Sequence, residues 1–278
     1  MLSEKLLQKV HVLELKIAIE IKRICEKHEI PYFLLAGSAL GAVRHGGFIP
    51  WDEDMDIGMR RPDYERFLAA CETDLGSEFF LHTWDTDPDY PFSFAKIRLN
   101  GTHFVEAVSK DAGLHDGIFV DIFPFDNAPD RAFQRRLQGI RYALCKRLLW
   151  IKKGFGTNMK ETRRQAVRYY LFLFFSKLFP YEAVKSYFRK VETKFNHKTT
   201  AYMAIDGSYT YERETIRREW AENLIPIQFE SEEFPIYQNC HAYLEHMYGD
   251  YMQLPPMELR DKHELLHVDF GSYQPDNR

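Results

Sequence analysis

The sequence predicts an α+β fold in which a mixed sheet forms the core and a basic, mostly helical segment follows it. Apolar residues recur at helical spacing near the N-terminus and again from residue 131 to 196. Between these stretches, short apolar runs bounded by Pro, Gly and Asn are typical of strands. The composition, 45% hydrophobic and 15% aromatic over 278 residues, allows a large core and argues against disorder.

We expect three parts: a catalytic-type core over 1–128, a basic, aromatic-rich helical subdomain over 129–198, and a mixed segment over 199–278 that packs back on the core.

The first half of the chain yields alternating helices and strands. Ser3 is a plausible N-cap for an amphipathic helix over 4–28, which Pro31 separates from a buried strand at 32–35. A short helix is expected over 38–45, and a strand carries Asp54 and Asp56. The next predicted elements are a helix from 62 to 71 and strands at 79–84 and 92–99. Asn100-Gly101 predicts a hairpin turn, with a returning strand at 103–108. A further strand is expected at 117–123, and Pro124 is expected to end it. A further strand is expected at 202–205.

Charge is unevenly distributed along the chain. The net charge is −4, but residues 131–190 hold 16 Lys and Arg against two acids, Glu161 and Glu182. This middle segment therefore carries +14 and the remainder −18, which suggests an anionic partner for the middle segment.

The same segment contains the most apolar run, 169–175, which is too short to span a bilayer. It is either a buried helix of an all-α subdomain or a surface helix that dips into a membrane. In the second reading, basic side chains meet anionic head groups: Arg163, Arg164, Arg168 and Lys177.

Cysteine usage and the N-terminus bear on the compartment. The four cysteines are far apart, with no metal or redox spacing, which indicates reduced thiols, and residues 1–9 lack the apolar core of a signal peptide. We expect a cytoplasmic protein, with peripheral contact to the inner face of the membrane as a further reading.

Three aspartates lie inside apolar surroundings. Asp54 and Asp56 alternate with Met55 and Ile57, so on a strand they would share one face. Asp121 interrupts an apolar run, and a buried strand would not carry a lone carboxylate without a partner for its charge. Oxygen ligands of this kind suit Mg²⁺ or Mn²⁺. The alternative is a solvated acidic loop, because most charge runs are loops or tails.

A glycine-serine turn precedes the aspartates. Gly37 lets backbone amides approach a ligand, and Ser38 opens a helix whose N-terminus could hold a phosphate. A Gly-Ser turn, an Asp-x-Asp strand and a third Asp on a later strand form a nucleotidyltransferase-type constellation. Phosphoryl transfer depends on such an arrangement, because its catalysis consists mainly of positioning the phosphate and stabilising the negative charge on its oxygens.

The stretch 37–58, GSALGAVRHGGFIPWDEDMDIG, resembles the LicD family, which includes the nucleotidyltransferase domains of fukutin and fukutin-related protein. Three further pieces resemble the family in the same order: Lys96-Ile97-Arg98 with Thr102, residues 119–124, and Tyr248-Gly249-Asp250-Tyr251 with Pro255-Pro256. The resemblance is dense over residues 30–125 and sparse beyond. Position 53 is Glu where some relatives carry Asp.

The resemblance implies a polymerase-β-like nucleotidyltransferase core with Mg²⁺ (or Mn²⁺) on Asp54, Asp56 and Asp121. It implies transfer of a phospho-alcohol, typically phosphocholine, from a CDP-alcohol donor to a hydroxyl of a glycan or glycolipid acceptor of the teichoic acid or lipopolysaccharide type, with release of CMP. Asp121 is a metal ligand, a base or both. No nucleic-acid partner is expected.

Other residues are candidates for substrate binding. Lys96 and Arg98 share a strand face and could hold donor phosphates, with a solvated face as the alternative. Asp52 is expected near the site because Trp51 shields it, with an exposed position as the alternative. Arg44 ends the phosphate-facing helix and is equally open to a surface role. Two other functions remain open: a nucleotidyltransferase moving NMP from an NTP to a small molecule or protein, and a non-catalytic binding module docked on a membrane. Product analysis separates the enzymes, because one releases CMP and the other pyrophosphate.

Overall fold

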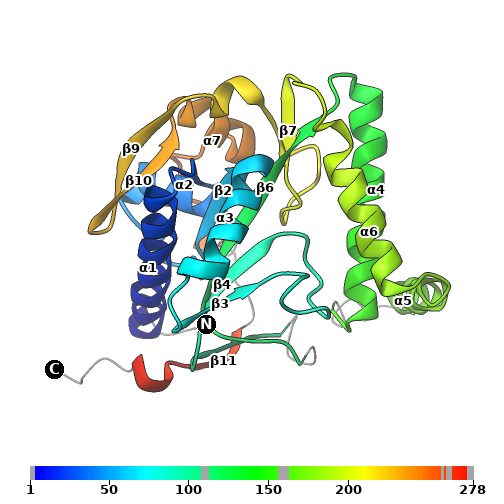
Figure 1. Cartoon of the computed structure of the whole chain (residues 1–278), viewed down its shortest axis with the longest axis horizontal. Helices are drawn as coiled ribbons and strands as arrows, with labels where there is room; N and C mark the ends of the chain where they lie inside the picture. Colours follow the sequence, from blue (N-terminus) through cyan, green and yellow to red (C-terminus); the bar gives the residue numbers. More distant parts are fainter. Residues whose placement is uncertain (1–3, 108–112, 156–162, 258–259, 261–264, 274–278) are drawn as a thin grey trace.

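The computed structural model describes residues 4–107, 113–155, 163–257, 260 and 265–273, and a mixed sheet forms its centre (Figure 1). The strands follow the order β1-β2-β6-β4-β3, and β7 and β8 extend the sheet from β6. Their bounds are β1 Phe33–Leu34, β2 Asp56–Arg60, β3 Phe79–His82, β4 Ala95–Leu99, β6 Phe119–Ala128, β7 Tyr202–Ala204 and β8 Thr215–Arg217. Two smaller ladders pair β9 Leu224–Phe229 with β10 Glu232–Tyr237, and β5 His103–Glu106 with β11 Leu265–Asp269.

The helices divide into those that cover the sheet and those that form a separate arm. The first group is α1 Glu4–Lys27, α2 Ala36–His45, α3 Arg61–Asp74 and α7 Cys240–Tyr248. The arm is α4 Ala132–Lys152, α5 Arg163–Ser176 and α6 Tyr181–Glu192. Figure 1 shows α4 and α6 side by side at one end of the molecule, with α5 at their lower end. Short 3₁₀ turns lie at Thr193–Phe195, Arg218–Ala221 and Gly271–Tyr273.

One pair of strands fixes the centre of the sheet. β2 and β6 run parallel, with Asp56 opposite Asp121, and β4 lies antiparallel on the other side of β6, with Lys96 opposite Asp121. β6 is buried on almost its whole length because strands flank it and α1 and α3 pack on it. Residues that are far apart in the chain therefore meet at Asp121.

The arm has its own core. Tyr142, Cys145 and Leu149 of α4 pack against Val184, Phe188 and Val191 of α6, as a cluster distinct from the main core. A buried ion pair joins the arm to the sheet: Arg61 of α3 donates two hydrogen bonds to Asp126, and its Nη2 lies 3.9 Å from Glu192 Oε2.

Most predicted elements are confirmed. The N-terminal helix ends at Lys27, one residue before the predicted end, and the second helix begins at Ala36 rather than 38. Among the described residues of 131–196, the helical character is confirmed, and residues 156–162 lie outside the described part of the chain. The strand predicted at 202–205 is present over Tyr202–Ala204. The mixed sheet confirms the α+β class.

The hairpin at Asn100-Gly101 is wrong. The turn exists, with Gly101 at φ +75°, but β5 pairs with β11 instead of β4. β3 occupies one edge of β4 and β6 the other, so β4 has no free edge for a returning strand. The predicted end of that strand, residue 108, lies outside the described residues.

Pro124 does not end its strand, because β6 continues to Ala128. On one edge, β6 pairs with β4 as far as Ile122 and with β7 from Asp126 onward. Proline, which has no N–H to donate, therefore stands where neither neighbour on that edge needs a bond.

The buried-helix reading of 169–175 is also wrong. α5 exposes Tyr170, Leu171, Phe174 and Phe175. Within the described part of the chain, no helix combines the length and apolar character that crossing a bilayer requires.

Candidate active site

The site is built where β2 begins. The Asp121 backbone N–H donates to the Met55 carbonyl (2.9 Å), and the Asp56 N–H donates to the Ser38 hydroxyl oxygen (2.8 Å). These bonds place Asp56 and Asp121 side by side on adjacent parallel strands. The ladder starts at Asp56, so the prediction that Asp54 lies within the strand is wrong. Burial still alternates through the segment, since Met55 and Ile57 are buried while Asp54 and Asp56 are half-buried.

The carboxylates of this site interact through their charges. Burial raises the pKa of Asp56 well above its usual range, and the nearby charges of Asp54, Asp121 and Asp52 raise it further. Burial also raises the pKa of Asp121 to about 6, although Lys96 opposes the shift. Like charges raise one another's pKa only when they are near and poorly screened. We call Glu14, Asp52, Asp54, Asp56 and Asp121 the carboxylate cluster.

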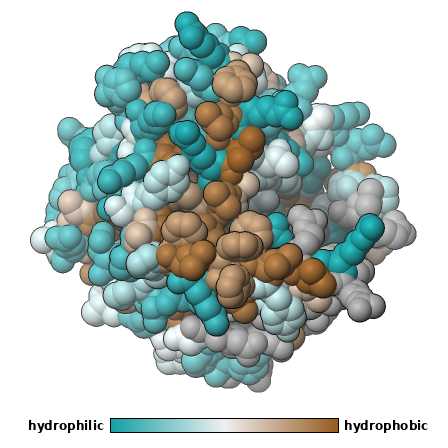
Figure 2. Space-filling view, turned by 90° about the vertical axis from the view of Figure 1, so that its right-hand side faces the viewer, coloured by the Kyte–Doolittle hydropathy of each residue, from teal (hydrophilic) through white to brown (hydrophobic). Residues whose placement is uncertain are grey.

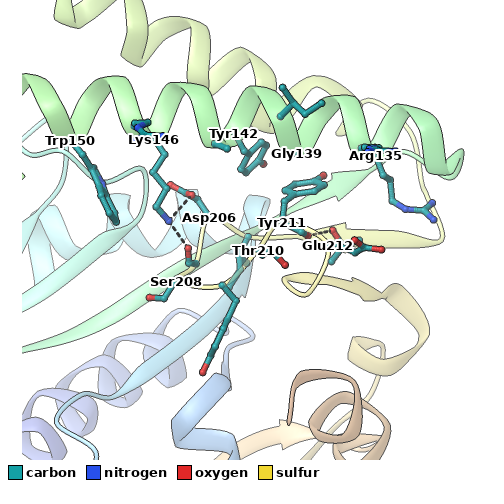
Figure 3. A pocket seen from close by; sticks show the side chains of 18 of the residues that line it. Arg135, Gly139, Tyr142, Lys146, Trp150, Asp206, Ser208, Thr210, Tyr211 and Glu212 are labelled. Atoms are coloured by element: carbon teal, nitrogen blue, oxygen red, sulfur yellow. Dashed lines mark hydrogen bonds and ion pairs between the residues drawn. The ribbon is translucent and has the colours of Figure 1, made fainter. Parts of the chain in front are cut away.

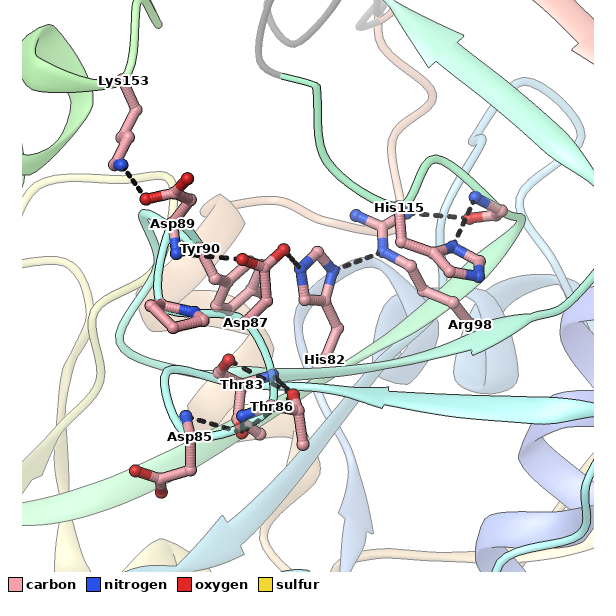
Figure 4. Close-up of polar contacts among 12 residues, drawn as sticks. His82, Thr83, Asp85, Thr86, Asp87, Asp89, Tyr90, Arg98, His115 and Lys153 are labelled. Carbon is pink, nitrogen blue, oxygen red and sulfur yellow. Dashed lines mark hydrogen bonds and ion pairs between the residues drawn. The ribbon is translucent and has the colours of Figure 1, made fainter.

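Lys96 supplies a positive charge to the cluster, and Arg98 points elsewhere. Lys96 Nζ lies 2.5 Å from Asp121 Oδ1 and 3.4 Å from the centroid of the Phe119 ring. Figure 4 shows Arg98 directed to His82, whose other ring nitrogen contacts Asp87. Arg98 also donates a hydrogen bond to the Gly117 carbonyl (2.8 Å). Phosphate binding by Lys96 and Arg98 stays a prediction, and Lys96 is the nearer to the carboxylates.

The N-terminus of α2 lies against Asp52. A Cβ at Gly37 would stand 2.4 Å from Asp52 Oδ2, so glycine is what allows this carboxylate to cover the first turn of α2. Ala36 N–H donates to the Tyr243 hydroxyl (3.0 Å), and Arg44 donates to the Tyr251 carbonyl (2.7 Å). The later family-like segment therefore packs on α2, and Arg44 has a structural partner there.

The carboxylate cluster has the donor chemistry that a divalent cation needs. Its donors are hard carboxylate oxygens. One buried oxygen, Glu14 Oε2, accepts no hydrogen bond from any described residue, whereas Asp121 Oδ1 has Lys96 Nζ at 2.5 Å. Among the described residues, however, no three His, Cys, Asp or Glu side chains converge closely enough to hold an ion. The residues therefore fit a divalent cation in charge and donor type, but the side chains as they stand do not have the geometry of an ion site.

Helix α1 also contributes to the site, through Glu14 and His11, which the sequence did not single out. Glu14 is 2% exposed, and its pKa is raised well above its usual range, first by burial and then by Asp54 and Asp52. His11 contacts the Asp52 carbonyl at 2.8 Å. A signal for Glu14 was present, because it stands four residues after Val10 and three before Ile17, on the apolar face of the helix.

A large groove of about 1190 Å³ lies apart from the three aspartates, between α4 and residues 205–212 (Figure 3). Lys146 of α4 crosses it to an ion pair with Asp206 (3.2 Å). Tyr209, in the wall of the groove, contacts the ring of Tyr248. The pKa of Tyr248 is raised, first by burial and then by nearby groups that include Asp56 and Asp52. The groove is therefore a neighbour of the carboxylate cluster.

Glu214, beside the groove, makes stability depend on pH. Its Oε1 accepts the Tyr209 N–H (2.9 Å), and burial raises its pKa to about 7. Since the folded pKa is above the unfolded one, folding keeps a proton, and stability falls as pH rises through about 7. Glu214→Gln should remove roughly 2–3 kcal/mol of that fall between about pH 5 and about pH 8. Urea unfolding measures it, with the exposed Glu222→Gln as control. Equal pH slopes in Glu214→Gln and the parent would contradict it.

The chain is similar in sequence to known proteins. Residues 29–143 match the family model described as "LicD/FKTN/FKRP, nucleotidyltransferase domain". Over 247 residues, 87% of this chain and 89% of the relative, the chain is 28% identical to the lipopolysaccharide cholinephosphotransferase LicD of Haemophilus influenzae. Over 102 residues, 37% of this chain and 18% of the relative, it is 33% identical to the human ribitol 5-phosphate transferase FKRP. The matched region contains the whole carboxylate cluster except Glu14.

Proposed function

We propose that this chain, whose residues 29–143 match the LicD family model and which is 28% identical to a LicD cholinephosphotransferase over 247 residues, is a LicD-type phosphotransferase. In this proposal it transfers phosphocholine from CDP-choline to a hydroxyl of a cell-surface glycan precursor and releases CMP. The observation that carries the proposal is the meeting of Asp56, Asp121 and Lys96 on three adjacent strands, next to Asp54. Choline is favoured over ribitol because the likeness to the choline enzyme extends over 87% of this chain.

The reaction exchanges one phosphorus–oxygen bond for another. The acceptor hydroxyl oxygen bonds to the phosphorus that carries choline, the bond from that phosphorus to CMP breaks, and a carboxylate of the cluster takes up the hydroxyl proton. CMP leaves with the electrons of the broken bond. Lys96 lies where it can attract donor phosphate oxygens, and Ser38 and Gly37 hold the strand and helix that frame them.

We assign a divalent cation, Mg²⁺ or Mn²⁺, to Asp54, Asp56 and Asp121. When bound, such an ion neutralises charge on the transferred phosphate and orients it. Support comes from the mutual charge repulsion of these carboxylates, which a cation would relieve. Because no three described side chains converge as they stand, binding requires these side chains to turn toward one another.

A donor screen tests the proposal. The purified protein is incubated with CDP-choline, CDP-ribitol or CTP, Mg²⁺ and a crude glycolipid acceptor, and nucleotide products are separated. The proposal expects acceptor-dependent CMP from CDP-choline, no turnover after EDTA treatment, and recovery on adding back Mg²⁺. Pyrophosphate from CTP would instead support a nucleotidyltransferase. CMP only from CDP-ribitol would keep the reaction type and overturn the choline assignment.

A further inference from the structure

The helical arm exposes a continuous apolar surface that no part of the described chain covers. On α4 the exposed apolar residues recur every three or four positions: Phe133, Leu137, Ile140 and Leu144. On α5 and just beyond it they do so again: Val167, Tyr170, Leu171, Phe174, Phe175, Leu178 and Phe179. We call these two stripes the docking face. Figure 2, which looks at the end of the molecule that carries the arm, shows a brown apolar band there, bordered by hydrophilic side chains.

The exposure is too large for ordinary surface variation. Phe133 is 78% exposed, and Phe174 and Leu178 are each 65% exposed. Single exposed apolar residues are normal, but contiguous patches usually mark a binding surface. A regular stripe along α5 that exposes Tyr170, Phe174 and Phe175 is the pattern of a helix that lies on an interface.

The positive charge around the docking face indicates what binds to it. Residues 131–190 carry +14, and exposed cations of the described segment include Arg131, Arg136, Arg164, Lys177, Arg189 and Lys190. A symmetric dimer through this face would place two such cationic fringes against each other. An anionic bilayer offers both an apolar interior for the stripes and negative head groups for the cations.

We propose that the docking face binds the surface of an anionic lipid bilayer, with α5 lying in the interface plane. Phe133 and Ile140 belong both to the docking face and to the lining of the groove described above. Docking would therefore hold the groove beside the lipid surface. This position of the groove suits an acceptor that is itself anchored in the membrane, a conclusion that rests on the proposed function.

Vesicle flotation with the full chain tests the proposal. The protein is expected to float with vesicles of phosphatidylglycerol and phosphatidylcholine, to bind phosphatidylcholine alone much more weakly, and to dissociate as salt rises. Replacing Leu171, Phe174 and Phe175 by serine should weaken binding by roughly 10²-fold, since three large side chains lose their apolar contact. Arg164→Gln and Lys177→Gln should each weaken it by about fivefold.

Matched controls separate docking from general hydrophobicity and from catalysis. Val12→Ser and Leu266→Ser change residues that are 65% and 50% exposed but lie on α1 and β11, and they should not alter flotation. With a lipid-free glycan acceptor, the triple serine variant should keep the parent rate of CMP release. A failure of that assay in the parent would count against the function and not against docking.

Two results would overturn the membrane proposal. One is flotation that is equal for the parent and the triple serine variant. The other is a parent protein that does not bind vesicles but forms oligomers in light scattering that the triple variant loses, because the docking face would then be a protein interface.

Discussion

Asp56→Asn is expected to lower CMP release by roughly 10³-fold or more and to raise the thermal stability of the metal-free protein. The activity falls because asparagine cannot supply the negative charge that holds the cation. Stability rises because a buried carboxylate that Asp54, Asp121 and Asp52 repel is replaced by a neutral group of the same shape. A gain of about 2 °C or more in Tm is a reasonable scale for one relieved repulsion in a chain of this length.

Asp56 is the cleanest position for this test. Asp121→Asn would also break the ion pair with Lys96, so its effect on stability mixes two opposite contributions. Asp85→Asn, at an exposed aspartate of another loop, is the matched control and should change neither property. CMP release and a thermal melt with EDTA measure the two effects. Parent-like turnover in Asp56→Asn, with Mg²⁺ present, would remove this residue from the active site.

Arg61→Met is expected to destabilise the protein by about 3–5 kcal/mol, the usual cost of leaving buried charges without their partner. Arg61 Nε and Nη2 lie 2.9 and 2.5 Å from the two oxygens of Asp126. The exposed Glu65 lies 3.4 Å away, and the buried Glu192 of α6 lies 3.9 Å away. Arg61 and Asp126 are 7% and 2% exposed, so water cannot replace the lost bonds. The substitution would leave two buried carboxylates facing each other where the arm meets the sheet.

The urea midpoint of unfolding measures this loss. The control is Arg217→Met, which breaks a pair with Glu219 whose side chains are 56% and 64% exposed and should cost less than about 1 kcal/mol. If Arg61→Met shifted the midpoint no more than this control, the buried pair would not be what fastens the arm to the sheet.

The sequence predicted the proximity of the aspartates better than the strand topology around them. Asp54, Asp56 and Asp121 stood out because carboxylates within apolar runs need a reason to be buried. The structure bears out the pairing of Asp56 with Asp121, although β2 begins only at Asp56. Lys96 could be placed on the same face by alternation, and its ion pair with Asp121 follows from the register of β4 on β6.

The errors arise where distant segments compete for one position. Asn100-Gly101 has the local chemistry of a hairpin, but no local signal shows that β3 and β6 already occupy both edges of β4. The continuation of β6 through Pro124 depends in the same way on where β4 ends and β7 begins. Exposure of α5 could not be read from its apolar sequence, since a buried helix and an interfacial one have similar composition.

The most direct test of the central claim is Mn²⁺ binding to the parent, Asp56→Asn and Asp121→Asn proteins, followed by the loss of the free-ion signal in electron paramagnetic resonance. The measurement needs neither donor nor acceptor, so it does not depend on which alcohol or glycan is used. The account predicts a site in the parent that both variants lose and that the control Asp85→Asn retains. Equal Mn²⁺ affinity in all four proteins would contradict it, because the aspartates of β2 and β6 would then hold no ion.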